Sequence, residues 1–231
     1  MTSSTIDLTS FDGKNFQGYL ALPPAKTGPG IVLIQEIFGV NAHIKAVADQ
    51  YALDGYVVLV PDLFWRMQPG VNLGYGQDDF EKGMGFLQKL DFHSAIQDLT
   101  ATVETLRNRP ECNGKVASLG YCLGGLLSYL SAAQAGVDAA VCYYPGAIEN
   151  HLDQAAEVRC PILIHFAEKD SYISPAAVKA VQSRFSNMKN AVVEVHPNVD
   201  HGFNCWERPS YNQQVSSLAH GLTLAFLAKA Y

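Results

Sequence analysis

Short, continuous apolar segments alternate with longer amphipathic segments along most of this 231-residue chain. The apolar segments have the length of strands that are covered on both faces, as in a parallel sheet. The longer segments carry apolar residues at spacings of three or four, which is typical of helices that pack on a sheet. The expected strands are 31–34, 56–60, 116–119, 139–143, 162–166 and 191–195, and the expected helices are 41–53, 92–107, 125–135, 175–185 and 211–228.

The first residues follow a different pattern. Segments 6–8 and 16–22 flank Asp12-Gly13-Lys14-Asn15, which predicts a β-hairpin. The whole pattern predicts an α/β fold, with a mostly parallel sheet, helices on both faces and an N-terminal antiparallel hairpin. No repeat, low-complexity segment or charged linker divides the sequence, so we expect a single domain, 1–231. Ligands of such folds bind at the carboxyl ends of the strands, and the residues that follow each strand are therefore the functional candidates.

Composition excludes several classes of function. The net charge of −6 and the lack of clustered lysine and arginine argue against a nucleic-acid partner. No apolar segment approaches the ~18 residues of a membrane-spanning helix, and no secretory signal is visible, so we expect no membrane association. The five cysteines are an odd number without a C-x-x-C pair. They argue against a disulfide framework and a metal site, and fit a reducing cytoplasm.

A cysteine stands in the turn after the expected strand 116–119. The segment Gly120-Tyr121-Cys122-Leu123-Gly124-Gly125 has the spacing of a nucleophile elbow, in which a strained turn presents the nucleophile at the start of a helix. The positive end of the helix dipole favours a thiolate there. Cys122 is therefore the candidate nucleophile, and a small core residue beside turn glycines is the alternative. We expect the remaining cysteines to be buried packing residues: Cys112, Cys142, Cys160 and Cys205.

An acid and a base follow two later strands. Asp170 comes after strand 162–166, where a turn or helix-capping role is the alternative. His201, one of seven histidines, follows the last expected strand. The order nucleophile, acid, base is that of the α/β-hydrolases, and each gap holds a strand–helix unit. The three residues together predict a Cys-His-Asp triad.

The loop after strand 31–34 is the expected second half of an oxyanion hole. Its candidate donor is the backbone N–H of Ile37, beside that of Leu123 after the elbow. Glu36 is anomalous there, because a carboxylate close to a thiol disfavours the thiolate; an arginine-paired or capping glutamate is the alternative. Aromatic residues that flank these positions are expected to line a substrate pocket, with core packing as the alternative: Phe38, Tyr144, Tyr172, Phe203 and Trp206.

These motifs, with Pro61-Asp62-Leu63 and His201-Gly202-Phe203, resemble the dienelactone hydrolase family (carboxymethylenebutenolidases) of the α/β-hydrolase superfamily. The likeness extends over nearly the whole chain. It implies a hydrolase that opens enol lactones through a Cys-His-Asp triad without a cofactor, and in which a glutamate at the position of Glu36 takes part in activating the thiol. The expected partner is a small ester or lactone substrate, and the expected state is a monomer or weak homo-oligomer.

The sequence departs from this family at two positions. Members that act on dienelactone carry two arginines that bind the substrate carboxylate. This chain has no arginine between Met67 and Leu106, and Cys205 stands four residues after His201; Arg66 and Arg208 are near but do not match. We therefore expect the carboxylate-binding pair to be missing or rebuilt. A general carboxylesterase or thioesterase, a non-catalytic small-molecule-binding protein and a thiol redox sensor remain alternatives.

Overall fold

The computed structural model describes residues 1–231, and its eight strands form one sheet. The sheet order is β1-β2-β4-β3-β5-β6-β7-β8. The strands from β3 to β8 pair in parallel, and β1 and β2 form an antiparallel hairpin on the edge next to β4. The bounds are β1 Thr2–Thr9, β2 Asn15–Leu22, β3 Gly28–Ile34, β4 Val57–Pro61, β5 Cys112–Tyr121, β6 Ala139–Tyr143, β7 Ile162–Ala167 and β8 Ala191–His196. The predicted fold class is confirmed.

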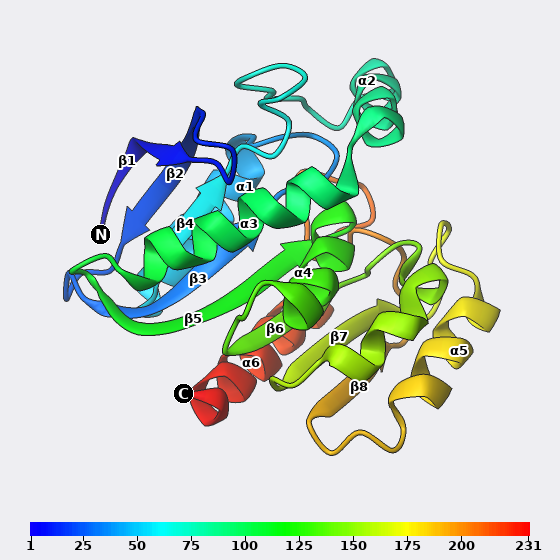
Figure 1. Ribbon diagram of the computed structural model, residues 1–231. Coiled ribbons are helices and arrows are strands. Elements are labelled where there is room, and N and C mark those ends of the chain that lie inside the picture. Colours follow the sequence, from blue (N-terminus) through cyan, green and yellow to red (C-terminus); the bar gives the residue numbers. More distant parts are fainter.

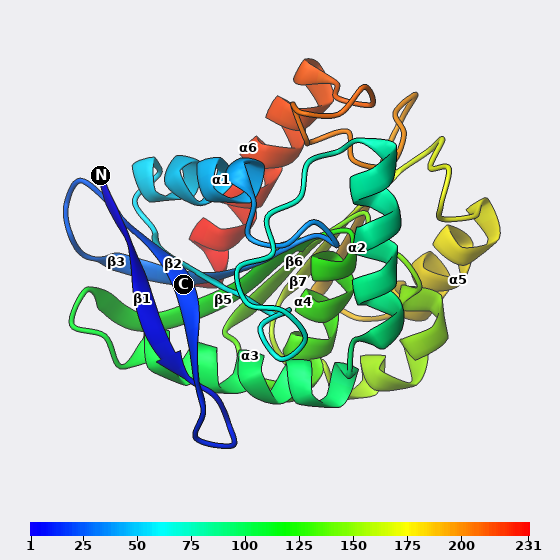
Figure 2. The same cartoon turned by 90° about the horizontal axis from the view of Figure 1, so that it is seen from above.

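Helices cover both faces of the sheet. Viewed from above, α1 and α6 lie on one side and α3, α4 and α5 lie on the other (Figure 2). Side-chain caps fix where several of them begin: Asn41 accepts from the Ile44 amide at the start of α1, and Asn212 from the Val215 amide at the start of α6. The bounds are α1 Ala42–Leu53, α2 Gln77–Lys89, α3 Phe92–Arg107, α4 Leu123–Gln134, η1 (a 3₁₀ segment) Ile148–Glu157, α5 Pro175–Phe185 and α6 Gln213–Ala230 (Figure 1).

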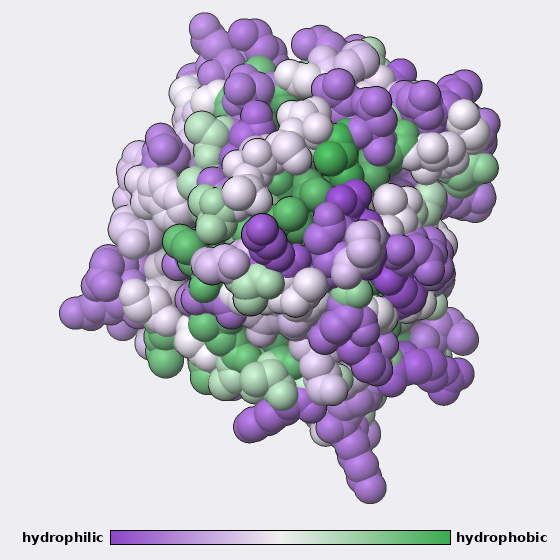
Figure 3. All heavy atoms as spheres, turned by 90° about the vertical axis from the view of Figure 1, so that its left-hand side faces the viewer, coloured by the Kyte–Doolittle hydropathy of each residue, from purple (hydrophilic) through white to green (hydrophobic).

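The core lies between the sheet and its two helical layers. Every residue of β4, β6 and β7 is buried, which explains why these strands are apolar runs, interrupted only by His165 in β7, rather than alternating ones. All residues of α4 from Leu123 to Ala132 are buried as well, so the helix after the elbow is fixed on all sides. On the face shown in Figure 3, hydrophobic residues are interspersed with hydrophilic ones rather than joined into one continuous area.

Two elements differ from the expectation. Helix α2 was not expected because Gly83 and Gly85 interrupt it, although Phe80, Met84 and Leu87 follow helical spacing. Segment η1 was not expected either, and its irregular backbone at His151 gives no regular period. None of the helices is long and apolar enough to span a membrane.

Two of the four cysteines expected in the core lie at its border. Cys142 and Cys205 are buried, as expected. Cys112 and Cys160 are only half-buried, so this prediction was wrong for them. Both cysteines lie outside the buried part of the sheet. Cys112 begins β5 ahead of three exposed residues, and Cys160 lies in the loop before β7.

Candidate active site

Cys122 occupies a strained turn between β5 and α4. Its φ of 55° and ψ of −117° are rarely adopted by a residue with a side chain. The turn is possible because its flanks are glycine: a Cβ on Gly120 would lie 2.1 Å from the Gly124 carbonyl oxygen, and one on Gly124 would lie 2.3 Å from that of Ile34. The Cys122 amide donates to the Tyr143 carbonyl oxygen at 3.0 Å, which ties the turn to β6. The thiol is thereby held at the N-terminus of α4.

Asp170 and His201 come together from the loops after β7 and β8. Nδ1 of His201 lies 2.9 Å from Oδ2 and 3.2 Å from Oδ1 of Asp170. Asp170 Oδ1 also accepts from the amides of Tyr172 and Ile173, each at 2.9 Å. Asp170 therefore both accepts hydrogen bonds within a turn and contacts His201. The turn hydrogen bonds orient its carboxylate toward the imidazole.

The environment of His201 favours its protonated form. Burial lowers its pKa, but the electrostatic interaction with Cys122 and the hydrogen bonds of the ring with Asp170 and Cys122 outweigh burial, so the pKa is raised above the usual value. The ring is almost completely buried and packs at 4.8 Å from the ring of Tyr144. Such an arrangement suits a thiolate–imidazolium pair.

Asp200 connects the two loops that carry Asp170 and His201. Its Oδ1 accepts from the amide of His201 at 2.6 Å and from the amide of Ser171 at 2.7 Å. Its Oδ2 accepts from Ser171 Oγ at 2.6 Å. These hydrogen bonds lower the pKa of Asp200 despite the opposing effect of burial. The carboxylate therefore fixes the backbone of His201 relative to that of the residue after Asp170.

Two backbone amides beside the thiol have no protein acceptor. These are the N–H groups of Ile37, in the loop after β3, and of Leu123, the first residue of α4. The first amides of a helix have no partner within it and are available to an anion. Helix α2 approaches Ile37 closely, since a Cβ on Gly83 would lie 2.8 Å from the Ile37 carbonyl oxygen.

Glu36 is buried behind this site. Its Oε2 accepts from the Tyr75 hydroxyl at 2.9 Å, and its Oε1 lies 3.5 Å from Nη1 of Arg208 and has no hydrogen-bond partner. Burial raises the pKa of Glu36, and the charge of Arg208 and the Tyr75 hydrogen bond oppose this. Asn41 donates to the Tyr75 hydroxyl at 3.2 Å and so orients it.

Arg208 lies in the site, although its sequence position does not match the family pattern. Its guanidinium lines the cavity and makes no hydrogen bond within the protein, so its donors are free for a ligand. Gly202 makes room for it: a Cβ there would lie 2.5 Å from Nη1 of Arg208, and φ is +78°. Arg66 lies elsewhere, in ion pairs of 2.9 Å with Asp12 and Asp98. Of the two arginines near the family positions, only Arg208 therefore lines the cavity.

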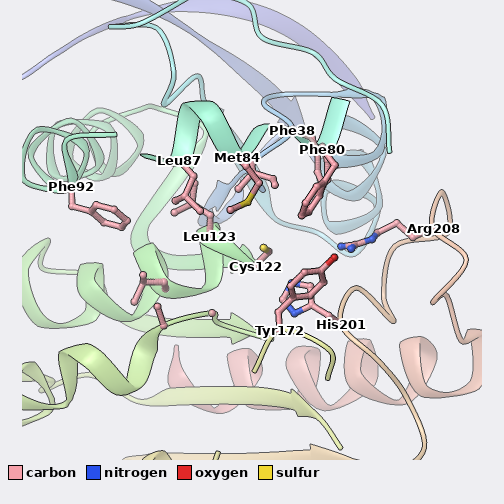
Figure 4. Close-up of a pocket in the computed structure, with 14 residues that line it drawn as sticks. Phe38, Phe80, Met84, Leu87, Phe92, Cys122, Leu123, Tyr172, His201 and Arg208 are labelled. Atoms are coloured by element: carbon pink, nitrogen blue, oxygen red, sulfur yellow. The ribbon is translucent and has the colours of Figure 1, made fainter. Parts of the chain in front are cut away.

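A cavity of about 260 Å³ opens above the thiol (Figure 4). Phe38 and Tyr172 line it, whereas the other aromatic residues proposed for its wall do not. Tyr144 and Phe203 are fully buried and pack against one another beneath it, with ring centroids 5.4 Å apart. Trp206 is 42% exposed and packs on His43. The lining residues are Ile37, Phe38, Phe80, Met84, Leu87, Phe92, Cys122, Leu123, Leu126, Gly146, Ala147, Tyr172, His201 and Arg208.

Several of these lining residues were not anticipated from the sequence. Phe80, Met84 and Leu87 come from α2. The glycines within α2 prevented the prediction of this helix, and therefore also of its cavity-lining residues. Their i, i+4, i+7 spacing was the available signal. For Arg208 the available signal was Gly202, because a glycine directly after a site histidine indicates close approach of another group. No cluster of three or more potential ligand side chains is arranged to hold a metal ion.

Comparison with known proteins supports a family assignment. The dienelactone hydrolase family model matches residues 16–231. The carboxymethylenebutenolidase of Pseudomonas putida is 33% identical over 232 residues, covering 99% of this chain and 97% of the relative. Carboxymethylenebutenolidase 1 of Cupriavidus pinatubonensis is 30% identical over 229 residues, with coverage of 99% and 97%.

A solved structure with the same fold strengthens this assignment. The putative dienelactone hydrolase of Klebsiella pneumoniae superposes with a TM-score of 0.86 at 25% identity, and 99% of each chain is covered. Sequence and structure therefore agree over essentially the whole chain. The chain belongs to the dienelactone hydrolase family and is a hydrolase with the α/β-hydrolase fold.

Proposed function

We propose that this hydrolase opens small carboxylic esters or enol lactones through a Cys122–His201–Asp170 triad. The observation that carries the proposal is that Cys122, after β5, and His201, after β8, line one cavity of about 260 Å³, while Asp170, after β7, contacts His201. The 2.9 Å contact of Asp170 with Nδ1 leaves Nε2 of His201 for the thiol. Relatives named carboxymethylenebutenolidase support a lactone or ester substrate.

The first half of the reaction forms a thioester. His201 takes the thiol proton, and the Cys122 thiolate attacks the carbonyl carbon. The N–H groups of Ile37 and Leu123 bind the oxyanion, at about 3 kcal/mol per donor. The C–O bond then breaks, and the leaving oxygen receives the proton from His201. In a lactone this oxygen stays attached to the acyl group.

The second half regenerates the thiol. His201 takes a proton from a water molecule, and the resulting hydroxide attacks the thioester carbonyl. The C–S bond breaks, the acid is released, and the proton returns to sulfur. Asp170 keeps the imidazole in the required tautomer throughout.

Glu36 and Arg208 have separate proposed roles. Arg208 holds unused donors at the cavity wall and is the group that would bind a substrate carboxylate. Glu36, whose Oε1 lies 3.5 Å from Nη1 of Arg208, holds the guanidinium in place at the cavity wall. A ligand carboxylate that pairs with Arg208 would weaken the Glu36–Arg208 contact and thereby alter the proton balance of the site.

The test uses purified enzyme, p-nitrophenyl acetate and a cognate enol lactone. Replacing Cys122 with alanine is expected to lower kcat by about four to six orders of magnitude, as for other removed nucleophiles. Cys112→Ala is the matched control, because this thiol lies at the start of β5, and should retain activity. A thioester adduct on Cys122 should be visible by intact-mass measurement after rapid acid quench. Full activity of Cys122→Ala would overturn the triad.

The other possibilities give different results. Tight ligand binding without hydrolysis of any ester would indicate a binding protein. Reversible peroxide modification of Cys122 without hydrolysis would indicate a redox sensor.

A further inference from the structure

The strained turn at Cys122 places its Cβ beside the nitrogen of the next residue. Viewed along the Cα–C bond, the Cβ of an L-residue lies about 120° from that residue's own nitrogen, because Cα is tetrahedral. The ψ of −117° at Cys122 therefore brings Cβ to within about 10° of eclipsing the Leu123 nitrogen. In ordinary helices and strands the same two atoms are roughly 80–105° apart about this bond. The turn thus holds Cβ and the Leu123 nitrogen on the same side of one plane.

This arrangement is the one that a five-membered ring requires. Sγ, Cβ, Cα and the carbonyl carbon of Cys122 form such a ring with the Leu123 nitrogen once a bond joins sulfur to nitrogen. A cysteine sulfenic acid that condenses with a backbone nitrogen makes this bond, and the product is a cyclic sulfenamide. Most cysteines would have to leave a favoured backbone conformation to close the ring, whereas the elbow already holds Cys122 in the required one.

The Leu123 nitrogen is free to react. Its N–H has no protein acceptor, and the first amides of a helix have no partner within it, so the loss of this hydrogen breaks no hydrogen bond of the fold. The Cys122 carbonyl oxygen accepts from the amides of Gly125 at 3.0 Å and Leu126 at 3.2 Å. When the Leu123 N–H gives up its proton, negative charge develops on this oxygen, and the two hydrogen bonds stabilise it.

The thiol is accessible to a small oxidant and has no second thiol beside it. Cys122 is half-buried and is the one cysteine that lines the cavity of about 260 Å³, so no disulfide partner is present there. In Figure 4 the Cys122 sulfur lies between Leu123 and His201. The pKa of His201 is raised to about 10 by its interactions with Cys122 and Asp170, so its imidazolium can protonate an oxygen that leaves the sulfur.

We propose that Cys122 is a site of reversible oxidation, at which hydrogen peroxide converts the thiol into a cyclic sulfenamide with the Leu123 nitrogen. The sulfur first bonds to one peroxide oxygen, the O–O bond breaks, and the other oxygen leaves as water, which gives a sulfenic acid. The Leu123 nitrogen then attacks the sulfur. The S–N bond forms, the S–O and N–H bonds break, and a second water leaves, with His201 carrying the proton.

Small thiols reverse the modification. One thiol opens the ring as a mixed disulfide with Cys122 and returns a proton to the Leu123 nitrogen, and a second thiol releases the Cys122 thiol as a new disulfide forms between the two. The oxidised protein lacks its nucleophile and the Leu123 N–H. It is therefore inactive, but its sulfur is protected from further oxidation to the sulfinic acid. This inference rests on the geometry of the turn and not on the hydrolysis of any ester.

Intact-mass measurement during treatment of the reduced protein with hydrogen peroxide tests the proposal. A species one oxygen heavier, which reacts with dimedone, should appear first, and a species two hydrogen atoms lighter than the reduced protein should replace it. Dithiothreitol should restore the original mass completely. A proteolytic digest should locate the lost hydrogens within the single peptide that contains Cys122 and Leu123. Cys122→Ala keeps the other four cysteines and is the control, which should lose no hydrogens.

Exchange of one backbone atom provides a second test. Replacing Leu123 with its α-hydroxy acid keeps the side chain but puts an ester oxygen in place of the N–H, and the fold should tolerate this because the N–H has no acceptor. Peroxide should then leave Cys122 as a sulfenic acid, and excess peroxide should take it to a sulfinic acid that dithiothreitol does not reduce. If this protein fails to fold, the wild-type digest decides by itself.

Three results with the wild-type protein would overturn the proposal. The first is a loss of two hydrogens that joins the Cys122 peptide to another cysteine-containing peptide, because that product is a disulfide. The second is a Cys122 sulfenic or sulfinic acid that accumulates without the lighter species. The third is a Cys122 that peroxide leaves reduced. Ester hydrolysis is measured separately on the reduced protein, so a failure of the proposed function would be seen there and not in these masses.

Discussion

Arg208 and Glu36, which are far apart in the sequence, meet inside the protein with Nη1 of the arginine 3.5 Å from Oε1 of the glutamate. The contact is an ion pair without a hydrogen bond, so the guanidinium keeps its donors for a ligand. The ring of Tyr75 lies against the same guanidinium, 5.9 Å from its carbon, and its hydroxyl holds Glu36. A substrate carboxylate at Arg208, as proposed above, would therefore compete with the Glu36 carboxylate that the protein already supplies.

Replacing Arg208 with glutamine should discriminate between charged and neutral esters. A hydrogen bond to a charged group contributes about 1.5–3 kcal/mol, which corresponds to about a 10- to 100-fold loss in kcat/KM for esters that carry a carboxylate. Neutral esters of the same size should lose much less. Steady-state kinetics on butyryl glycolate and its methyl ester measure the difference, and equal losses on both would contradict carboxylate binding by Arg208.

The stability of the protein should depend on pH through Glu36. Burial raises the pKa of Glu36 above its ordinary value of 4.5, so the folded protein binds this proton more tightly than the unfolded chain does. The resulting stabilisation is complete below that ordinary value and is lost as the pH rises through the raised pKa. The free energy of unfolding of wild type, relative to that of Glu36→Gln, should therefore fall as the pH increases from about 4.5. Urea unfolding at several pH values tests this, and a rise would refute it.

Gly83 should act on the reaction through its contact with Ile37. A methyl group at Gly83 would lie 2.8 Å from the Ile37 carbonyl oxygen and would displace α2 or the loop that carries the proposed oxyanion donor. Gly83→Ala should lower kcat about tenfold or more, because misplacements near 1 Å cost about a hundredfold. Gly85→Ala, with nothing within 4 Å of its added Cβ, is the control and should gain about 1 kcal/mol of stability without losing activity.

Asp200 should behave as a positioning residue for His201. Asp200→Ala removes the acceptor of the 2.6 Å hydrogen bond from the His201 amide and should lower kcat/KM about tenfold. Asp200→Asn keeps an oxygen for this amide and should retain most activity. The pH dependence of kcat/KM is the informative measurement, because a freed His201 loop changes the pKa of the imidazole. An unchanged profile in Asp200→Ala would leave Asp200 with a purely structural role.

The sheet was predictable from sequence because its strands are buried on both faces. Continuous apolar runs such as those of β6 and β7 leave little ambiguity. The place of Cys122 was predictable for a related reason, since only glycine fits at Gly120 and Gly124. Its role in a triad stays a prediction.

The rest of the site depends on loops whose path no local pattern indicates. Arg208 reaches the cavity because the chain after His201 turns back over Gly202, which depends on tertiary packing. Tyr144 follows the end of β6 and Phe203 flanks His201, as the pocket argument required, yet both are fully buried in the core. Position along the sequence indicates which edge of the sheet a residue occupies, but not the side to which its side chain turns.

The parallel order of β3 to β8 also has a consequence for how the protein is made. Each of these pairings joins segments that are separated by a crossover, so the sheet depends on contacts between distant parts of the chain, and such contacts form slowly. The loops after β5, β7 and β8 come together only after these three strands have paired in the sheet. During refolding from denaturant, helical signal should therefore return before turnover does, and the recovery of activity marks the completion of the native state.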